Sequence, residues 1–512
     1  MEEPAVDNQD AVPSSGVVDA IKATPAPPPE KPTDTRTRRW IIVSFWAVAA
    51  LLGLPVWIWT TTVHRASLPL DTMNRWAEGR ACSLQFPVPV ALDTSSLSER
   101  DADRLHNLLN LTINHHEYPF HRLQLFSATD SQAPEPVVTI RINTEGSGDE
   151  PRAELHQYAP ILDIYCSAAY ADSKSVFLGQ FVSSAIVKLF AEELVSLSRL
   201  MHHDTTASSY PLFTEMAHNL ERRSMRSFRY APTYHLTFSL FSATSSPSAW
   251  DIKAALDEYL APLLESFSPI STFTVDTQVQ LYAALSPSMH GPVYNEETKQ
   301  WMLQKSDLTS FINAAEWPLS PSIGAGPTIN FVLYAPSEDR SPMVIAETGG
   351  NSWLIPQWGG VQILNDHPGA ARNRTSLSKG DLEPFVHTLA DQLISLFGLP
   401  QTPASLPLRM SSLTRERSTS LILSASSTLG ALARLSLKLT SIAIPDNVAK
   451  SVQKTVHHLE QSCTDLREGR FQSALQNARV AEGEAEQAFL NRPWLGKSTS
   501  LTSIRWLCTF LC

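Results

Sequence analysis

Cysteine is scarce in this chain, and basic residues are outnumbered by acidic ones. The 512 residues include 5 cysteines, 40 Lys and Arg residues and 51 Asp and Glu residues, for a net charge of −11. So few, scattered cysteines exclude a disulfide-rich scaffold, and no C-x-x-C pair is present to bind a structural zinc ion. One disulfide could form, but the sequence does not assign its partners. The acidic balance argues against nucleic acid as a partner, because phosphate binding needs clustered Lys and Arg.

The common motifs of catalytic sites are also missing. No G-x-S-x-G nucleophile elbow is present, and the GKS run at 496–498 has Asn491 where a P-loop needs glycine. Cys166 lies in an apolar, strand-like run and is expected to be a buried hydrophobic residue rather than a nucleophile. Three histidine doublets lack the i, i+4 spacing of a zinc helix, at 115–116, 202–203 and 457–458. We therefore predict no catalytic, metal or cofactor site.

One motif, Asp101-Ala102-Asp103, is of a kind that glycosyltransferases use to hold a metal-bound nucleotide sugar. Ser96 and Glu99 predict a capping box at the start of a helix that carries it. On a helix, residues two apart point about 200° away from each other, so these carboxylates cannot share one cation. The motif is expected to lie on a solvated helix face.

A long uncharged apolar block covers residues 40–59. Twenty residues form a helix of roughly 30 Å, the thickness of the hydrocarbon core of a bilayer. Tryptophans lie at both ends, where amphipathic rings prefer the membrane interface, and membrane helices tolerate the internal glycine and proline. The predicted anchor residues are Trp40, Gly53, Pro55, Trp57 and Trp59.

The sequence around this block predicts its processing and orientation. The 39 residues before it are too many for a cleaved signal peptide, so we expect an uncleaved anchor. Four cations precede the block closely, against two soon after it: Lys31, Arg36, Arg38 and Arg39, then Arg65 and Arg75. The positive-inside rule places the N-terminus in the cytosol and the rest on the lumenal or outer side. Two glycosylation sequons fall on that far side, at Asn110 and Asn373.

Most of the region after the anchor alternates between strand and helix patterns, which predicts an α/β domain with a mixed sheet flanked by helices. Expected strands lie at 82–92, 137–142, 161–168, 234–243, 272–285 and 328–335. Expected helices lie at 97–110, 182–201, 250–267 and 381–397.

The last part of the chain has only helical patterns. Pro445 and Gly469 bound one amphipathic helix, and the following residues to 490 predict a second, so we expect an antiparallel hairpin. The predicted organisation is a disordered tail (1–39), a transmembrane helix (40–63), an α/β domain (64–405), a helical region (406–490) and an atypical tail (491–512).

The stretch GLPVWIWTTTVHRASLPL (53–70) closely resembles the start of the PIG-S family, a subunit of the glycosylphosphatidylinositol (GPI) transamidase complex. That family has GLP-x-W inside its first membrane helix and then a T-x-x-x-R-A-S-L-P run. Further segments resemble it in the same order: FTVDTQVQLYAAL, TINFVLYAPS, PQWGGVQILN, DQLISLFGLP and IPDNVAKSVQKTVHHLEQS. The resemblance covers residues from about 40 to 489.

The resemblance implies a non-catalytic lumenal subunit at the endoplasmic reticulum membrane. The complex replaces a C-terminal signal of a proprotein with a GPI lipid. The family pattern puts the nucleophilic cysteine in another subunit, a caspase-like protease, so the implied partners are that protease, the other subunits, the membrane, and proprotein and GPI lipid through the complex. No matched position carries a catalytic role or a cofactor. The alternatives are an anchored lumenal enzyme such as a glycosyltransferase, or a cell-surface adhesion or receptor ectodomain.

The sequence departs from the family near its end. Family members have a second membrane helix there, whereas the apolar stretch at 504–512 is too short to cross a hydrocarbon core that needs about 20 helical residues. We interpret the tail as that of a truncated or misread gene product, with a genuine single-pass variant as the alternative. The expected topology is single-pass as the sequence stands, against two passes in the family.

Overall fold

A computed structural model of the chain describes residues 32–61, 65–115, 120–130, 133–145, 150–201, 211–285, 291–308, 311, 326–365, 375–439 and 443–490. By their internal contacts, residues 1–64 form one unit and residues 65–512 a second, compact unit.

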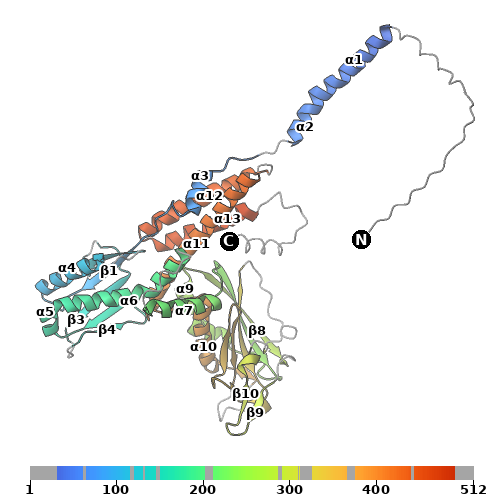
Figure 1. Cartoon of the computed structure of the whole chain (residues 1–512). Helices are drawn as coiled ribbons and strands as arrows, with labels where there is room; N and C mark the ends of the chain where they lie inside the picture. The colour runs from blue at the N-terminus through green and yellow to red at the C-terminus, as the bar shows by residue number, and fades with distance from the viewer. Residues whose placement is uncertain are drawn as a thin grey trace, which may run out of the picture. The chain divides into compact units, whose positions relative to one another are not determined.

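The first unit contains a continuous helical rod. α1 (Pro32–Val48), a π-helical turn (Ala49–Gly53) and α2 (Leu54–Thr61) follow one another directly (Figure 1). The helix begins before the apolar block because Pro32 favours a first helical position and needs no amide partner there. Pro55 cannot donate to the carbonyl four residues earlier, which explains a widened turn at this point. Leu51 is 74% exposed and Trp40 66%, so this rod needs lipid or another protein to cover its side chains.

Two described helices are long and apolar enough to cross a membrane, Pro32–Ile58 and Leu406–Lys438. None of the first is buried, whereas 44% of the second is buried inside the protein. The second helix, α11 (Leu406–Lys438), also carries the fully buried Arg415 in an ion pair with Glu193. α11 therefore belongs to the protein core, and the first helix is the candidate membrane span that is not covered by the rest of the described protein.

The first sheet of the compact unit has the strand order β2-β1-β3-β5-β4, and only β4 runs antiparallel to its neighbour. Two long helices, α4 and α6, pack side by side, with Gly179 of α6 against Leu108 of α4 (Figure 1). The strands are β1 (Phe86–Asp93), β2 (His121–Ser127), β3 (Val138–Asn143), β4 (Arg152–Leu155) and β5 (Ile161–Tyr165). The helices are α4 (Glu99–His115), α5 (Ala168–Ser173) and α6 (Ser175–Met201).

The second large sheet repeats this plan with the order β13-β14-β11-β6-β8, in which only β13 is antiparallel. Its central strands are buried on both faces, which their continuous apolar runs predict. The strands are β6 (Thr233–Ser242), β8 (Thr272–Leu281), β11 (Thr328–Ala335), β13 (Ser352–Ile355) and β14 (Gly359–Ile363). The associated helices are α7 (Pro211–Arg226), α8 (Ile252–Ala255), a π-helical turn (Leu256–Leu260), α9 (Ala261–Phe267) and α10 (Lys379–Phe397).

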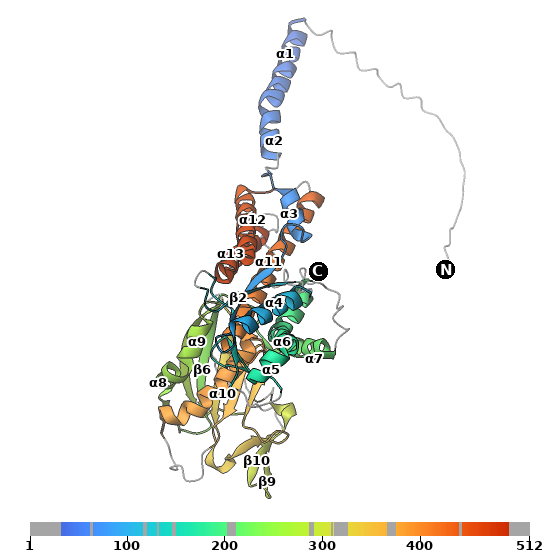
Figure 2. The same ribbon diagram turned by 90° about the vertical axis from the view of Figure 1, so that its left-hand side faces the viewer.

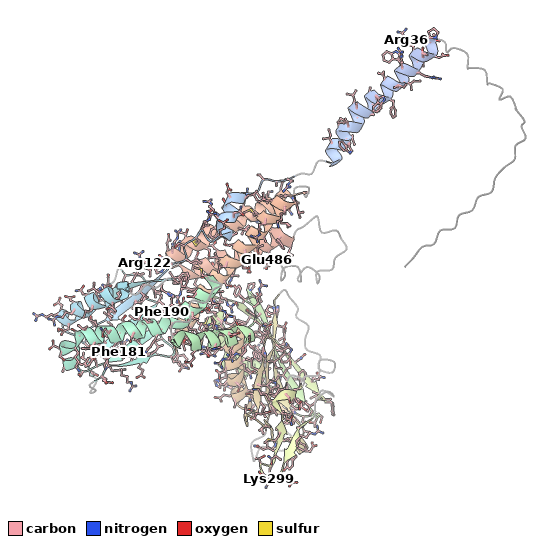
Figure 3. All side chains as sticks on the ribbon, viewed as in Figure 1. Arg36, Arg122, Phe181, Phe190, Lys299 and Glu486 are labelled. Atoms are coloured by element: carbon pink, nitrogen blue, oxygen red, sulfur yellow. A yellow bond between two sulfur atoms is a disulfide. The ribbon has the colours of Figure 1, made fainter. Side chains whose placement is uncertain are left out.

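Shorter strands extend this second region. A three-stranded sheet consists of β9 (Val293–Asn295), β10 (Gln300–Leu303) and β12 (Met343–Ile345), and Figure 3 marks Lys299 in the turn between β9 and β10. β7 (Ala249–Trp250) pairs with β15 (Ser376–Leu377). Two short 3-10 helices lie at Lys305–Asp307 and Glu338–Arg340.

The C-terminal helices α11, α12 (Asp446–Arg467) and α13 (Phe471–Leu490) form a bundle with the short α3 (Leu70–Ala77) (Figure 2). α12 and α13 form the predicted antiparallel hairpin, and Gly469, at φ +79°, lies in the turn between them. The largest apolar core of the protein combines this bundle with one face of the second sheet. The mixed α/β fold with a C-terminal helical region is thus confirmed.

Candidate functional site: the clamp after the anchor

Residues 65–82, which we call the clamp, follow the N-terminal apolar helix in the sequence and are attached to the C-terminal helices at three places. The first attachment is Arg65, the arginine of the R-A-S-L-P run. Its Nη2 donates hydrogen bonds to the carbonyl and hydroxyl oxygens of Ser436 at 2.8 and 3.1 Å, and its Nη1 donates to the carbonyl of Leu439 at 3.3 Å. The last carbonyls of a helix have no partner within it, so a cation that binds them satisfies their hydrogen bonds and complements the helix dipole.

The backbone continues this attachment. Ala66 donates its amide hydrogen to the carbonyl of Ile444 at 2.9 Å, and Arg65 forms a parallel bridge with the same residue. Leu68 and Leu432 line a small cavity beside Arg65, of about 30 Å³. The start of the clamp, at Arg65 and Ala66, therefore lies across the end of α11 and the start of α12.

The second attachment is the packing of α3 on α11. Met73 and Trp76 of α3 are buried in the main core. At the crossing point, a Cβ added to Gly430 would lie 2.5 Å from the Cβ of Ala77. No side chain larger than hydrogen fits at position 430 without moving α3, so this glycine permits the close approach of the two helices.

The third attachment is a disulfide between Cys82 and Cys463 of α12, with a Cα–Cα distance of 6.1 Å. The sequence left this pairing open, because 381 residues separate the two cysteines and no local pattern links them. Cys166 is free and buried, as expected, and burial raises the pKa of its thiol. A thiol that resists ionisation is a poor nucleophile.

A buried ionic junction connects the same bundle to the first sheet. Arg415 of α11 donates from Nε and Nη2 to the two carboxylate oxygens of Glu193 on α6, at 2.6 and 2.7 Å. His121 of β2 lies 3.1 Å from the same carboxylate, and Arg415 also lies over the ring of Phe471, the first residue of α13. Burial acts to raise the pKa of Glu193, but the charges of Arg415 and His121 outweigh it and hold this pKa well below its ordinary value.

A second ionic group lies next to the first. Arg223 of α7 donates to Glu192 of α6 at 3.0 Å and to Glu416 of α11 at 2.7 Å. Glu192 also accepts hydrogen bonds from the amide and hydroxyl of Thr402, both at 2.8 Å. Burial raises the pKa of Glu416, although Arg223 acts against this. These contacts fix α6, α7 and α11 to one another, and sequence reasoning missed all of them. The sequence feature that pointed to buried ionic contacts was the charged run Arg415-Glu416-Arg417, which lies inside a helix otherwise rich in apolar and small residues.

An open cleft of about 790 Å³ lies where the first sheet, the turn before β8 and the helical bundle meet. Tyr158, Ile270 and Met410 are among its lining residues. Arg470 is the charged residue that lines the cleft, and its guanidinium donates a hydrogen bond to Asp465 at the α12–α13 turn. The cleft therefore presents an apolar surface and small polar groups rather than a set of reactive side chains.

Of the two aspartates in the Asp-x-Asp motif, only Asp101 has a structural role, at the start of α4. The expected capping box of Ser96 and Glu99 is wrong, because α4 begins later and Ser98 caps it, together with Asp101 (2.6 Å between Ser98 Oγ and Asp101 Oδ2). Ser96 instead donates its hydroxyl hydrogen to the carbonyl of Ile142. With Asp101 engaged at the helix start and Asp103 exposed, the motif does not form a joint cation site.

Other predicted positions are placed as follows. Within the described ranges, no group of three or more His, Cys, Asp and Glu side chains could hold a metal ion. His458 interacts with Asn477 at 3.0 Å, and His457 is exposed. Asn110 is half-buried on α4. The remaining predictions lie outside the described residues or side chains: Asn373, the side chain of Trp59, the doublets at 115–116 and 202–203, and the tail 491–512.

Comparison with known proteins extends the resemblance found in the sequence. The sequence profile of the family described as "PIG-S: Phosphatidylinositol-glycan biosynthesis class S protein" matches residues 44–496. The chain is 26% identical over 493 residues to the GPI-anchor transamidase component PIGS of Homo sapiens, with 87% of each chain covered. It is 23% identical over 436 residues to the GPI transamidase component GPI17 of Saccharomyces cerevisiae, covering 82% of this chain and 77% of that protein. The match covers most of the apolar block and every described residue of the compact unit, and the chain belongs to the phosphatidylinositol-glycan biosynthesis class S (PIG-S) family.

Proposed function

We propose that this chain is a non-catalytic, membrane-anchored subunit of a GPI transamidase in the endoplasmic reticulum, with residues after the anchor in the lumen. The observation that carries this proposal is the family match over residues 44–496, to relatives that are themselves named as components of this transamidase. We further propose that its partners include a caspase-like cysteine protease subunit, which supplies the nucleophile, and that proprotein and GPI lipid are met through the complex.

Two independent features support the lumenal orientation. Cations are more frequent before the anchor than after it, which favours a cytosolic N-terminus. The Cys82–Cys463 disulfide lies on the other side of the anchor, and such bonds persist in oxidising compartments such as the lumen of the endoplasmic reticulum.

The chemistry of the described side chains favours a structural rather than a catalytic role for this subunit. The free cysteine is buried with a raised pKa, and the Asp-x-Asp motif caps a helix. The buried carboxylates Glu192 and Glu193 are held by arginines inside the protein, where substrate cannot reach them.

The clamp explains how an unreactive subunit aids a transfer reaction. Both substrates of the reaction are attached to the membrane, so a subunit fixed beside that membrane raises their effective concentration and limits their orientations. The three attachments fix residues 65–82, which follow the anchor in the sequence, to the helical bundle.

The test replaces residues 40–59 in the full-length chain while lumenal delivery is kept. In one variant a cleavable signal peptide delivers the chain without an anchor, and in a matched control an unrelated apolar helix of equal length takes the place of the block. We expect the first variant to lose co-purification with the cysteine-protease subunit and to fail to restore GPI-anchored proteins in cells that lack the native subunit. We expect the control to retain both. Full function without any anchor would overturn the proposed role of tethering, and absence of the protease from purified wild-type protein would overturn the assignment itself.

A further inference from the structure

We propose that the end of the helical bundle next to Arg65 touches the lipid headgroups of the membrane that holds the anchor, through Leu437, Lys438 and Leu490. This inference rests on the proposed membrane anchoring and deepens it, since it assigns a second, non-spanning membrane contact to the protein.

The first observation is the length of chain available. Only five residue steps separate Thr60, the first residue after the apolar block, from Arg65. Five steps extend at most about 17 Å. The headgroup layer on each side of a bilayer is about 5–8 Å thick, the difference between the full bilayer and its hydrocarbon core. Arg65 therefore lies within the headgroup layer or at most about 12 Å beyond it.

The second observation is what Arg65 holds. Its guanidinium binds the carbonyls of Ser436 and Leu439 at the end of α11. Ala488 of α13 and Val448 of α12 line the same small cavity. The C-terminal ends of α11 and α13 and the start of α12 consequently share one end of the bundle, and that end is tied to the residue that leaves the membrane.

The third observation is the chemistry of this end. Leu437 is 57% exposed and Leu490 56%, whereas the leucines further inside the bundle are buried. Arg434 and Lys438, one turn apart on α11, are also exposed. Exposed leucines beside lysine and arginine are typical of surfaces that lie in a membrane interface, because apolar side chains enter the acyl boundary and cations meet phosphates.

A lipid surface fits this end of the bundle better than a second protein does. The lipid surface is already present at this end by chain connectivity, and it needs no further recognition. The exposed Asp446 and Glu486 lie on the neighbouring ends of α12 and α13, so the contact is confined to a few side chains at the edge of the bundle rather than a deeply inserted helix.

The test uses the full-length chain in phosphatidylcholine nanodiscs with a single environment-sensitive fluorophore. The background carries Cys508→Ser and Cys512→Ser, and the label is placed at Leu437→Cys or Leu490→Cys. Leu51→Cys in the anchor is the control for insertion. Gln461→Cys, an exposed α12 position roughly 20 Å along the helix from Val448, is the control for a bundle surface away from this end. Quenching by lipid-attached nitroxide is compared with quenching by aqueous iodide.

We expect nitroxide to quench the labels at 437 and 490 several-fold more strongly than the label at 461, and iodide to show the reverse order. Iodide quenching at 437 and 490 equal to that at 461, with the Leu51 label in lipid, would overturn the membrane contact and leave the anchoring intact. Protection from both quenchers would also overturn it, because it would mean that protein covers the leucines. A Leu51 label outside lipid would overturn the anchoring and this inference together. Co-purification with the protease tests the subunit assignment separately.

Discussion

Arg415 and Glu193 meet through two hydrogen bonds inside the protein although 222 residues separate them in the sequence. Arg415 is completely buried and Glu193 is 3% exposed. Removal of one partner from a buried pair leaves an uncompensated charge, which costs about 3–5 kcal/mol. We expect Arg415→Met to lower the free energy of unfolding by this amount, measured by denaturant unfolding of detergent-solubilised protein.

The double variant Arg415→Met/Glu193→Gln provides the control, because it removes both charges. We expect it to be more stable than Arg415→Met alone. Equal stability of the single variant and the wild type would show that the pair does not hold α6 to α11.

Acid stability depends on the same carboxylate. The pKa of Glu193 is lowered on folding, so its contribution to stability is complete above its ordinary pKa and is lost as pH falls below that value. We expect Glu193→Gln to be less stable than the wild type at pH 7 and the difference to shrink toward pH 3 in thermal unfolding experiments. Glu416 acts in the opposite direction, since a raised pKa favours the folded state as the group becomes protonated. A constant difference across this pH range would contradict the assignment to Glu193.

Close packing of α3 on α11 gives a third prediction. Gly430→Ala places a methyl group 2.5 Å from the Cβ of Ala77, and overpacking of this kind costs about 1–3 kcal/mol. Gly483→Ala on α13 is the matched control, because its Cβ meets nothing within 4 Å. There we expect a gain of about 0.5–1 kcal/mol from the helix preference of alanine. Opposite shifts of the unfolding midpoints would confirm the prediction, and a stabilised Gly430→Ala would contradict it.

The Arg65 contact gives a fourth prediction that concerns assembly. Arg65→Ala removes the donors to the end of α11, a loss of roughly 1–2 kcal/mol for a partly exposed helix-terminal cation. We expect reduced co-purification with the other transamidase subunits, measured by quantitative mass spectrometry after affinity capture. Arg75→Ala, on the exposed side of α3, should leave co-purification unchanged. Equal losses in both variants would point to a general effect of charge.

Glycosylation of Asn110 and Asn373 stays a prediction. Asn110→Gln and Asn373→Gln should each increase electrophoretic mobility by one glycan, and a glycosidase should abolish the difference. Use of either sequon would place that residue in the lumen, because the transfer of glycan occurs there. A wild-type mobility that the glycosidase does not change would show that neither sequon is used.

The sequence predicted most of the central strands of the two large sheets, because strands buried on both faces have long apolar runs, but it missed the central strand β14 (Gly359–Ile363). The expected strand at 328–335 coincides with β11 (Thr328–Ala335), and that at 161–168 contains β5. The edge strand β4 was not predicted, since its four residues are mostly exposed and have no apolar pattern, whereas the edge strand β8 (Thr272–Leu281) lies within the expected strand at 272–285. α3 was missed for a different reason. Its eight residues contain only two buried side chains, which are too few to show a helical hydrophobic period.

The clamp could be predicted only in part. The family pattern singled out the residues R-A-S-L-P, but it did not say that Arg65 binds the end of α11, because that contact depends on the tertiary fold. The same holds for Cys82 and Cys463 and for the partners of Arg415. Long-range pairs of this kind leave no local pattern, and only unusual residues in unusual surroundings, such as charges within α11, mark them.

The disulfide also determines how the protein behaves when its chain is cut. Cys82 and Cys463 close a covalent ring that contains both sheets and most of the helices. A protease that cleaves once at any point within this ring opens it without releasing a piece. Both halves stay joined to the N-terminal apolar helix until the disulfide is reduced, so nicked protein keeps its apparent mass on a non-reducing gel and separates into two fragments only after reduction.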